Sequence, residues 1–293
     1  MDGPMTGTPR ESRVPVGDGD LVVAEYGPAD GMPLLAIHGI TSSSRAWLAL
    51  ARRLPEYRIV APDLRGRGRS RDLPPSTGLR HHAADLARLV DALGLAPVPV
   101  VGHSMGAFVA VALADARPDA VASLLLVDGG YPLARPAGVA DDDLAGAVLG
   151  PIAARLAQEF PDRAAYHDFW RRHPAFGGEL TDDLVAYADY DLVGEPPHLR
   201  TASTLEAIAA DSLDLYGSDW HLAALARLEP PALLLRAPRG LLDEPGGLYP
   251  GLAGTPPLAP TMRVEDVDDV NHYTILMSDH GAGVVADAVR AAR

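Results

Sequence analysis

Ser104 is the residue of this sequence best placed to act as a nucleophile. It is the centre of the pentapeptide Gly-His-Ser-Met-Gly at residues 102–106. An apolar run at 97–101 precedes it and an Ala/Val-rich segment with helical spacing follows, so the sequence predicts a strand that turns sharply into a helix at the serine. In such a nucleophile elbow, small residues two positions away relieve crowding, and the helix N-terminus offers N–H groups to a developing oxyanion. The chemistry that this arrangement favours is acyl transfer.

A serine hydroxyl is a weak nucleophile near neutral pH and needs a neutral imidazole as its base. The sequence offers ten histidines and no cysteine. Without cysteine, a thiolate nucleophile and a disulfide framework are excluded, and no histidine spacing is typical of metal ligation. We therefore expect an oxygen nucleophile, no metal and no cofactor.

Short apolar runs alternate with helical periodicities along most of the chain, which is typical of a mostly parallel sheet with helices on both faces. Strands are expected at residues 21–26, 33–37, 57–61, 97–101, 121–127, 232–236 and 261–267. Helices are expected near residues 45–53, at 79–93, from the elbow to Arg117, and at 278–290. This alternation predicts an α/β fold.

Four segments of the chain occur in the order of a known superfamily. They are His38-Gly39 after a strand, Pro-Asp-Leu-Arg-Gly-Arg-Gly-Arg-Ser at 62–70, the pentapeptide at 102–106, and Asn271-His272 near the end. Together they resemble the α/β-hydrolase superfamily, from about Leu21 to Arg290 with the exception of about 131–225.

The resemblance implies roles for several residues. It places the base at His272, in the loop between the last strand and the last helix. His280 lies eight residues further on, inside the expected helix, and its position there favours an ordinary solvated residue. The Ile40 and Met105 N–H groups are expected to form a two-donor oxyanion hole. His38 and Gly39 are expected beside the substrate, and His103 is expected to shape the elbow.

Residues 131–225 show no strand pattern, only helical segments interrupted by Pro and Gly and rich in aromatic side chains. In the superfamily a helical cap enters after the sixth strand, so we expect a cap at 131–225 and a core domain formed by 1–130 and 226–293. Most of the aromatic rings are expected to form the cap's own core. Trp170 is the ring that we expect in the wall of the substrate pocket.

A serine and a histidine of this kind need a third residue, a carboxylate that orients the histidine, and the sequence does not decide which carboxylate this is. The superfamily takes this carboxylate from the loop after either the sixth or the seventh strand, and the usual position after the seventh strand is here Gly240. Asp128 follows directly after the sixth strand and is the first choice. Asp243 is the alternative if the seventh-strand loop is longer than usual, and Asp211 or Asp214 is a more remote choice.

Composition limits the partners. Lys and Arg number 25 against 39 Asp and Glu, which gives a formal net charge of −14. Nucleic acids and anionic membranes require a basic surface, so neither is an expected partner. Residues 1–13 lack an apolar run and are expected to form a flexible lead-in rather than a signal peptide, and no later run is long enough to span a bilayer. We expect a cytoplasmic monomer or homodimer.

These observations predict a serine hydrolase that cleaves a small-molecule carboxylic ester or a lactone through an acyl-enzyme. One alternative on the same fold is a carbon–carbon bond hydrolase or a cofactor-free perhydrolase, because fold does not determine function. The other is a catalytically silent ligand-binding protein.

Overall fold

The computed structural model describes residues 8–135, 137–139, 146–147, 153–252 and 259–292, and its centre is an eight-stranded sheet of order β1-β2-β4-β3-β5-β6-β9-β10. The strands are Arg10–Pro15 (β1), Asp20–Tyr26 (β2), Met32–Ile37 (β3), Tyr57–Pro62 (β4), Val98–His103 (β5), Val121–Val127 (β6), Ala232–Arg236 (β9) and Met262–Asp266 (β10). From β4 to β10 all neighbours are parallel, while β2 pairs antiparallel with both β1 and β4. The expected mostly parallel sheet is confirmed.

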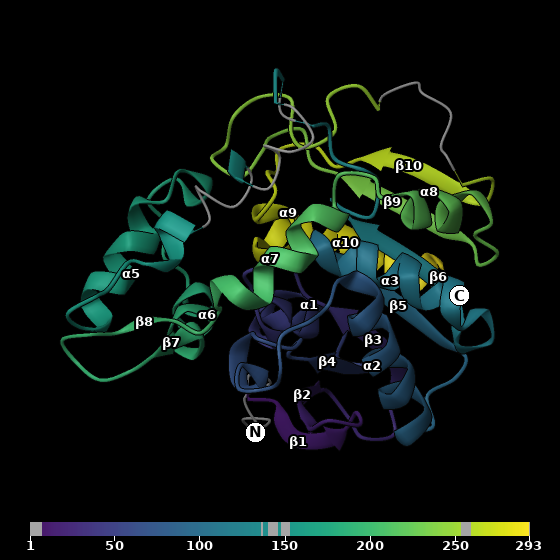
Figure 1. Cartoon of the computed structure of the whole chain (residues 1–293), viewed down its shortest axis with the longest axis horizontal. Helices are drawn as coiled ribbons and strands as arrows, with labels where there is room; N and C mark the ends of the chain where they lie inside the picture. Colours follow the sequence, from purple (N-terminus) through teal and green to yellow (C-terminus); the bar gives the residue numbers. More distant parts are fainter. Residues whose placement is uncertain (1–7, 136, 140–145, 148–152, 253–258, 293) are drawn as a thin grey trace, which may run out of the picture.

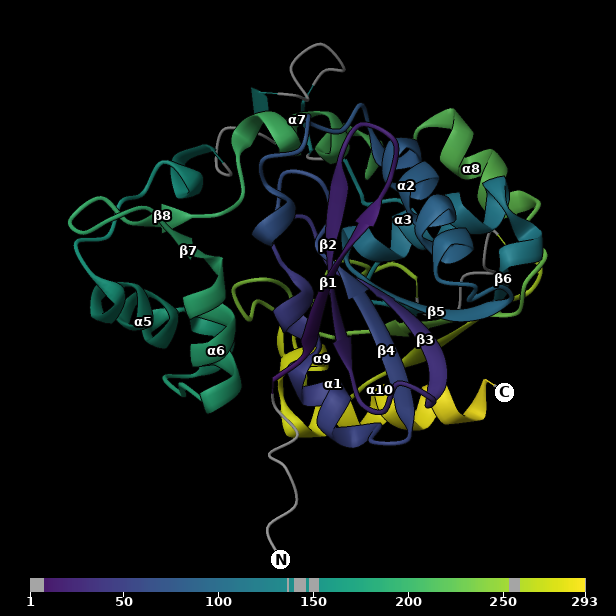
Figure 2. The same cartoon turned by 90° about the horizontal axis from the view of Figure 1, so that it is seen from below.

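Helices cover both faces of this sheet (Figure 2). One face carries α1 (Leu48–Arg53), α9 (Thr274–Met277) and α10 (Asp279–Ala291), and the other carries α2 (Leu79–Ala92), α3 (Met105–Ala116) and α8 (Asp219–Ala226). Each layer of helices packs on the sheet through its own large apolar cluster. Strands that are buried on both faces read as nearly continuous apolar runs, as β6 does with Val-Ala-Ser-Leu-Leu-Leu-Val, where Ser123 is the one polar residue.

Two expectations about regular structure were wrong. Within the expected lead-in, residues from Arg10 onward form β1, which pairs with β2 along its whole length. All its side chains except that of Val14 are exposed, so the sequence carries no apolar alternation that would reveal this edge strand. The segment 131–225 also contains a two-stranded ribbon, Leu192–Val193 (β7) with Arg200–Thr201 (β8), which is too short to show a strand pattern.

The inserted segment divides into two parts (Figure 1). Helices α5 (Arg163–Arg172) and α6 (Asp182–Asp191) lie with the β7–β8 ribbon to one side of the core. Helix α7 (Leu205–Asp214) leads back over the core, and α8 packs against α3, where the Phe108 and His221 rings lie 4.9 Å apart. The end of the segment expected as a cap therefore covers the sheet.

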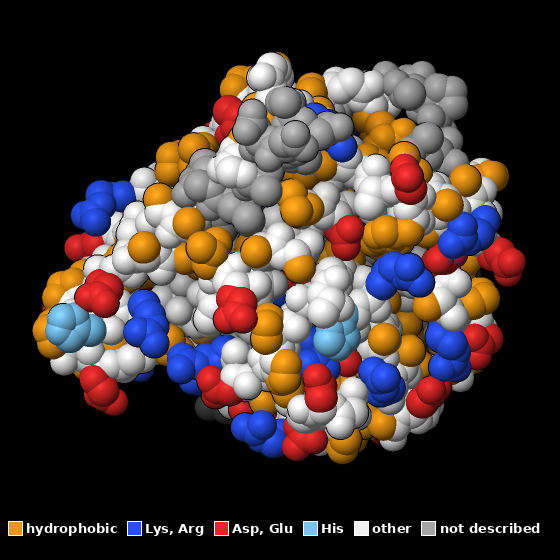
Figure 3. Space-filling model, in the orientation of Figure 1, with side chains coloured by type: hydrophobic (Ala, Val, Ile, Leu, Met, Phe, Trp, Pro, Cys, Tyr) orange, Lys and Arg blue, Asp and Glu red, His pale blue; other side chains and the backbone are white. Residues whose placement is uncertain are grey.

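Acidic and basic side chains are interspersed on the face of the molecule shown in Figure 3. Surface ion pairs join charged side chains of the molecule, such as Arg227 with Asp115 and Arg117 with Asp91. Among the helices that the structure describes, none has both the length and the apolar character needed to cross a membrane.

Candidate active site

Ser104 occupies a strained turn between β5 and α3. Its backbone has φ 54° and ψ −126°, and α3 begins at the next residue. Gly106 makes this turn possible, because a Cβ there would lie 2.0 Å from the Ile37 carbonyl oxygen. Gly102 is equally tight, since its Cβ would lie 2.4 Å from the Gly106 carbonyl oxygen. The small residues on either side of the serine thus allow the backbone to pack closely and hold the hydroxyl at the end of β5.

His272 lies between Ser104 and Asp128. Its Nε2 is 3.1 Å from Ser104 Oγ, and its Nδ1 is 2.7 Å from Asp128 Oδ2. Asp128 is fully buried and the His272 side chain nearly so. The three groups come from the ends of β5 and β6 and from the loop between β10 and α9, so residues up to 168 positions apart form one hydrogen-bonded chain.

The pairing of β6 with β9 holds Asp128 in place. The Asp128 N–H donates to the Leu235 carbonyl at 2.8 Å, and the Ala237 N–H donates to Asp128 Oδ1 at 3.1 Å. One carboxylate oxygen is therefore occupied by the backbone of the neighbouring strand end, and the other is left for His272. Of the carboxylates that the sequence proposed, Asp128 is the one that the structure brings to the histidine.

Asp243 lies near the histidine loop but bonds to other groups. Its Oδ1 accepts from Arg239 Nε at 2.7 Å and from Asn271 Nδ2 at 2.9 Å, and these hydrogen bonds lower the pKa of the Asp243 carboxyl. Asn271 Nδ2 also donates to the Ala175 carbonyl. Asp243 thus restrains the residue before His272 instead of bonding to the imidazole.

The remaining carboxylate candidates lie elsewhere. Asp211 bonds to Ser76 and His82, and Asp214 accepts from the Leu79 N–H and from Trp220 Nε1. Both hold α7 against the start of α2.

The loop at 38–41 packs against the serine. A Cβ on Gly39 would lie 3.1 Å from Ser104 Cβ and 3.6 Å from its Oγ. Met105 is the first residue of α3, and the first N–H groups of a helix have no partner within it. The Ile40 and Met105 amides therefore belong to the two segments that meet at the serine.

Two neutral histidines support this arrangement. Burial lowers the pKa of His38 to about 4 and that of His103 to about 3. His38 Nε2 accepts from the Leu64 N–H at 2.9 Å, and its Nδ1 donates to the Gly39 carbonyl at 2.8 Å. His103 Nε2 donates to the carbonyl of His272 at 2.8 Å. His38 therefore braces the oxyanion loop from behind, and His103 braces the histidine loop.

Comparison with known proteins connects this geometry to a family. The family model of the alpha/beta hydrolase fold matches residues 32–148. A non-heme chloroperoxidase of Streptomyces lividans is 30% identical over 256 residues, which cover 81% of this chain and 92% of that relative. The chain belongs to the α/β-hydrolase superfamily. The fold expected from the sequence motifs is thereby confirmed.

Two further matches show how the likeness is distributed along this α/β hydrolase. Lipase LipV of Mycobacterium tuberculosis is 43% identical over 170 residues, 57% of this chain and 63% of the lipase, so the match spans less than two thirds of that relative. The crystal structure of E-2-(acetamidomethylene)succinate hydrolase superposes with a TM-score of 0.79 at 26% identity, covering 96% of this chain and 98% of that one. The structural likeness therefore includes the segment after β6.

A pocket opens beside Ser104 in this α/β hydrolase. Besides the serine and histidine, its lining consists of Gly39, Ile40, Thr41, Ser42, Ala46, His103, Tyr187, Leu241, Tyr273, Leu276 and Met277. Sequence reasoning missed most of these residues. Two of them could have been found from the sequence. Tyr273 follows His272 directly, and Tyr187 is one of the aromatic residues of the inserted segment.

Two residues expected at the substrate do not line this pocket. His38 is fully buried behind Gly39. Trp170 is 3% exposed and packs in an aromatic cluster, with its ring 5.6 Å from that of Tyr187 and 6.1 Å from that of Tyr273. Both lie behind residues that line the pocket. The expectation was wrong because local sequence does not reveal which side of a loop or helix faces the cavity.

Proposed function

We propose that this protein hydrolyses carboxylic esters, lactones included, through a covalent acyl-enzyme on Ser104. The single observation that carries the proposal is the chain Ser104 Oγ, His272 Nε2, His272 Nδ1, Asp128 Oδ2, with distances of 3.1 and 2.7 Å at its two hydrogen bonds. This is the geometry of a nucleophile, a base and a carboxylate that orients the base. The 43% identity to a protein named as a lipase supports the same class of reaction.

In the first half of the reaction, Ser104 Oγ attacks the ester carbonyl carbon while its proton passes to His272 Nε2. The carbonyl electrons move to oxygen, and the Ile40 and Met105 N–H groups stabilise the resulting oxyanion. Asp128 stabilises the imidazolium without taking its proton. When the tetrahedral intermediate collapses, His272 gives the proton to the leaving alkoxide, and the acyl group stays on the serine.

In the second half, His272 takes a proton from water, whose oxygen attacks the acyl-enzyme. A second oxyanion forms in the same place. Its collapse breaks the bond to Ser104 Oγ, which recovers a proton from His272, and the carboxylic acid leaves. In a lactone the alcohol and acid belong to one molecule, so the product is a hydroxy acid.

A hydrolysis screen tests the proposal. p-Nitrophenyl esters of increasing acyl length and a set of lactones are offered to the wild type and to Ser104→Ala at equal concentration. We expect turnover by the wild type and its loss in the variant. A catalytically silent binding protein would turn over none of these compounds, and activity retained by Ser104→Ala would contradict the assigned nucleophile.

A second candidate reaction is transfer of the acyl group to hydrogen peroxide. The observation that favours it is the likeness to a protein named as a non-heme chloroperoxidase over 92% of that protein's length. Peroxide in place of water would release a peracid from the same acyl-enzyme. Peracid formation from an ester and hydrogen peroxide, dependent on Ser104, is the assay that detects it.

A further inference from the structure

The loop at 62–70 brings an unusual arginine into the core. The side chain of Arg67 is fully buried, and so is that of Asp211 on α7, which it meets at 2.7 Å from Nη2 to Oδ2. Removing one partner of a buried ion pair leaves the other charge buried and uncompensated, so Arg67 and Asp211 depend on each other. The other contacts of the Arg67 guanidinium identify the segments of the chain that this ion pair connects.

Arg67 contacts both residues whose N–H groups would bind the oxyanion. Its Nε donates to the Ile40 carbonyl at 2.9 Å. Its Nη2 lies 3.8 Å from the Sδ of Met105, a weak acceptor. Its Nη1 donates to the Arg65 carbonyl at 2.8 Å and so fixes the guanidinium to its own loop. One planar group thus touches the residue that follows Gly39 and the first residue of α3.

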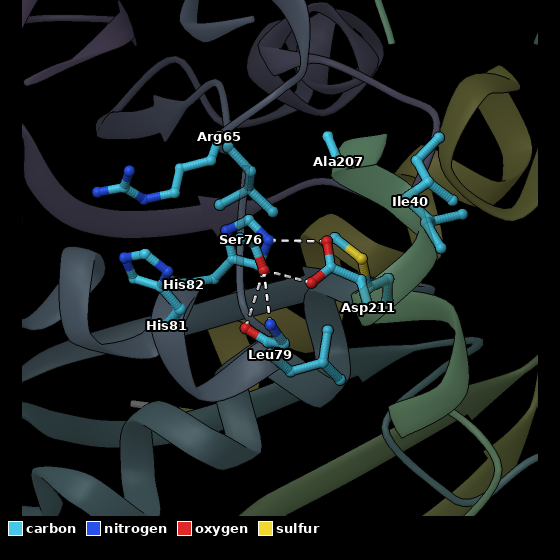
Figure 4. A network of polar contacts seen from close by, with 12 residues as sticks. Ile40, Arg65, Ser76, Leu79, His81, His82, Ala207 and Asp211 are labelled. Carbon is cyan, nitrogen blue, oxygen red and sulfur yellow. Dashed lines mark hydrogen bonds and ion pairs between the residues drawn. The ribbon is translucent and has the colours of Figure 1, made fainter. Parts of the chain in front are cut away.

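Further side chains hold Asp211, the partner of Arg67; Figure 4 shows its carboxylate beside Ser76 and His82. Its Oδ1 accepts from Ser76 Oγ at 2.5 Å and its Oδ2 from His82 Nε2 at 2.9 Å, in addition to Arg67. Burial alone would raise the pKa of Asp211, but the bond from His82 and the charge of Arg67 outweigh it and lower that pKa to about 2. The carboxylate is therefore ionised, and it ties α7 and the start of α2 to Arg67.

The same loop contains a second buried arginine, Arg65, which can be compared with Arg67. Its side chain is 1% exposed and pairs with Asp85, which is equally buried, and with Asp18. Among the hydrogen bonds of the described residues, those of the Arg65 side chain go to Asp85, Asp18 and the Pro74 carbonyl, and to neither Ile40 nor Met105. The two arginines are thus alike in burial and pairing and differ in whether they reach the serine's surroundings.

We propose that Arg67, held by Asp211, is a positioning residue that sets the Ile40 and Met105 amides for the oxyanion. The inference rests on the proposed function, since it assigns a support to the same oxyanion hole. It also gives α7 a role at the site, because this helix of the inserted segment supplies the carboxylate that orients Arg67.

Three variants test this role with a p-nitrophenyl ester: Arg67→Met, Asp211→Asn, and Arg65→Met as the matched control. A burst titration counts the active sites, so kcat is expressed per functional serine and any fraction that fails to fold is removed from the comparison. Binding of a trifluoromethyl ketone, whose adduct with Ser104 carries an oxyanion, reports the hole directly. Asp85→Asn is a second control for the Arg65 pair.

We expect Arg67→Met to lower kcat per site by roughly 10- to 100-fold with little change in KM, less than the ~10²–10³ for removal of a whole oxyanion donor. Affinity for the trifluoromethyl ketone falls by a similar factor, Asp211→Asn shows a smaller loss, and Arg65→Met leaves both quantities at the wild-type level. Unchanged kcat per site and ketone affinity in Arg67→Met would overturn the inference while wild-type turnover persists. Absence of ester turnover and of a burst in the wild type would instead overturn the proposed function, and this inference with it.

Discussion

The carboxylate of Asp128 accepts the Nδ1 proton of His272 and so leaves Nε2 free to accept the proton of Ser104. An imidazole that is turned or protonated the other way would present a donor to the serine and could not act as its base. The Ala237 N–H, just after β9, occupies the second oxygen of Asp128, and the oxygen left for His272 favours the tautomer that the proposed reaction requires.

Replacing Asp128 by Asn tests this account of the acid. An amide in place of the carboxylate favours the wrong tautomer, and we expect kcat to fall by about 10³- to 10⁴-fold with the fold retained. Steady-state hydrolysis of a p-nitrophenyl ester measures the loss, and circular dichroism checks the fold.

Asp243→Asn is the matched control for this substitution. Its carboxylate bonds to Arg239 and Asn271, so we expect kcat within a few-fold of the wild type, from a modest loosening of the histidine loop. A large loss in Asp243→Asn together with near-normal turnover in Asp128→Asn would reverse the assignment.

Local motifs predicted part of the candidate site and could not predict the rest. The surroundings of Ser104 are a single run of five residues, and His272 follows a recognisable Asn, so both were accessible from sequence. Local sequence could not decide between Asp128 and Asp243, because the choice depends on which of the two carboxylates the packed strands bring to His272. The Arg67–Asp211 pair was invisible, since its partners lie far apart in the chain and meet only when α7 packs over α2.

Helices α5 and α6 depend on an aromatic cluster for their packing. Trp170 of α5 contacts the rings of Tyr166, Phe176 and Tyr187, and it reaches Tyr273 across the boundary with the core. Because Tyr187 and Tyr273 line the pocket, the cluster couples the stability of the inserted segment to the shape of the site.

Truncating the central ring tests that coupling. We expect Trp170→Ala to reduce the free energy of unfolding by about 3–5 kcal/mol, as for other buried aromatic side chains, and to raise KM for a bulky ester as Tyr187 and Tyr273 lose their support. Leu213→Ala, on the exposed face of α7, should change neither quantity. Chemical denaturation measures the stability and steady-state kinetics measures KM. A Trp170→Ala variant as stable as the wild type would contradict this packing.

The sheet could be predicted where burial dictates composition. β3, β5, β6 and β9 are buried on both faces, so their apolar runs identify them. β1 could not be found in this way, because an edge strand with exposed side chains is held by backbone hydrogen bonds that leave no trace in residue type.

Acid stability is a property of the whole molecule, because buried histidines occur on several elements. Burial lowers the pKa of His38 to about 4, of His103 to about 3 and of His221 to about 4, while an unfolded imidazole titrates near 6.5. Below about pH 6.5 the unfolded chain thus binds more protons than the folded one, and stability falls as the pH drops toward these values.

Urea unfolding at pH values from 7.5 to 4.5 measures this loss. Between pH 6.5 and 4.5 the depression at His38 alone corresponds to about 3 kcal/mol at ~1.4 kcal/mol for each pH unit, so the three histidines together predict a decline of at least this size. In His38→Gln, whose amide offers a donor and an acceptor but does not titrate, the decline should be shallower.

His198→Gln is the control for that experiment, since the His198 side chain is 72% exposed. Its decline with pH should match the wild type. A wild-type stability that stays constant from pH 7.5 to 4.5, or an unaltered slope in His38→Gln, would show that burial of these imidazoles does not govern acid unfolding.

In the proposed function the whole fold brings one reactive hydroxyl and one imidazole together, and covalent labelling tests this pair most directly. Folded protein is treated with a fluorophosphonate, and the modified peptide is located by mass spectrometry in the wild type, in Ser104→Ala and in His272→Ala. We expect a single adduct on Ser104, none in Ser104→Ala, and labelling slowed by orders of magnitude in His272→Ala. No adduct on Ser104, or equally fast labelling without the imidazole, would contradict the account.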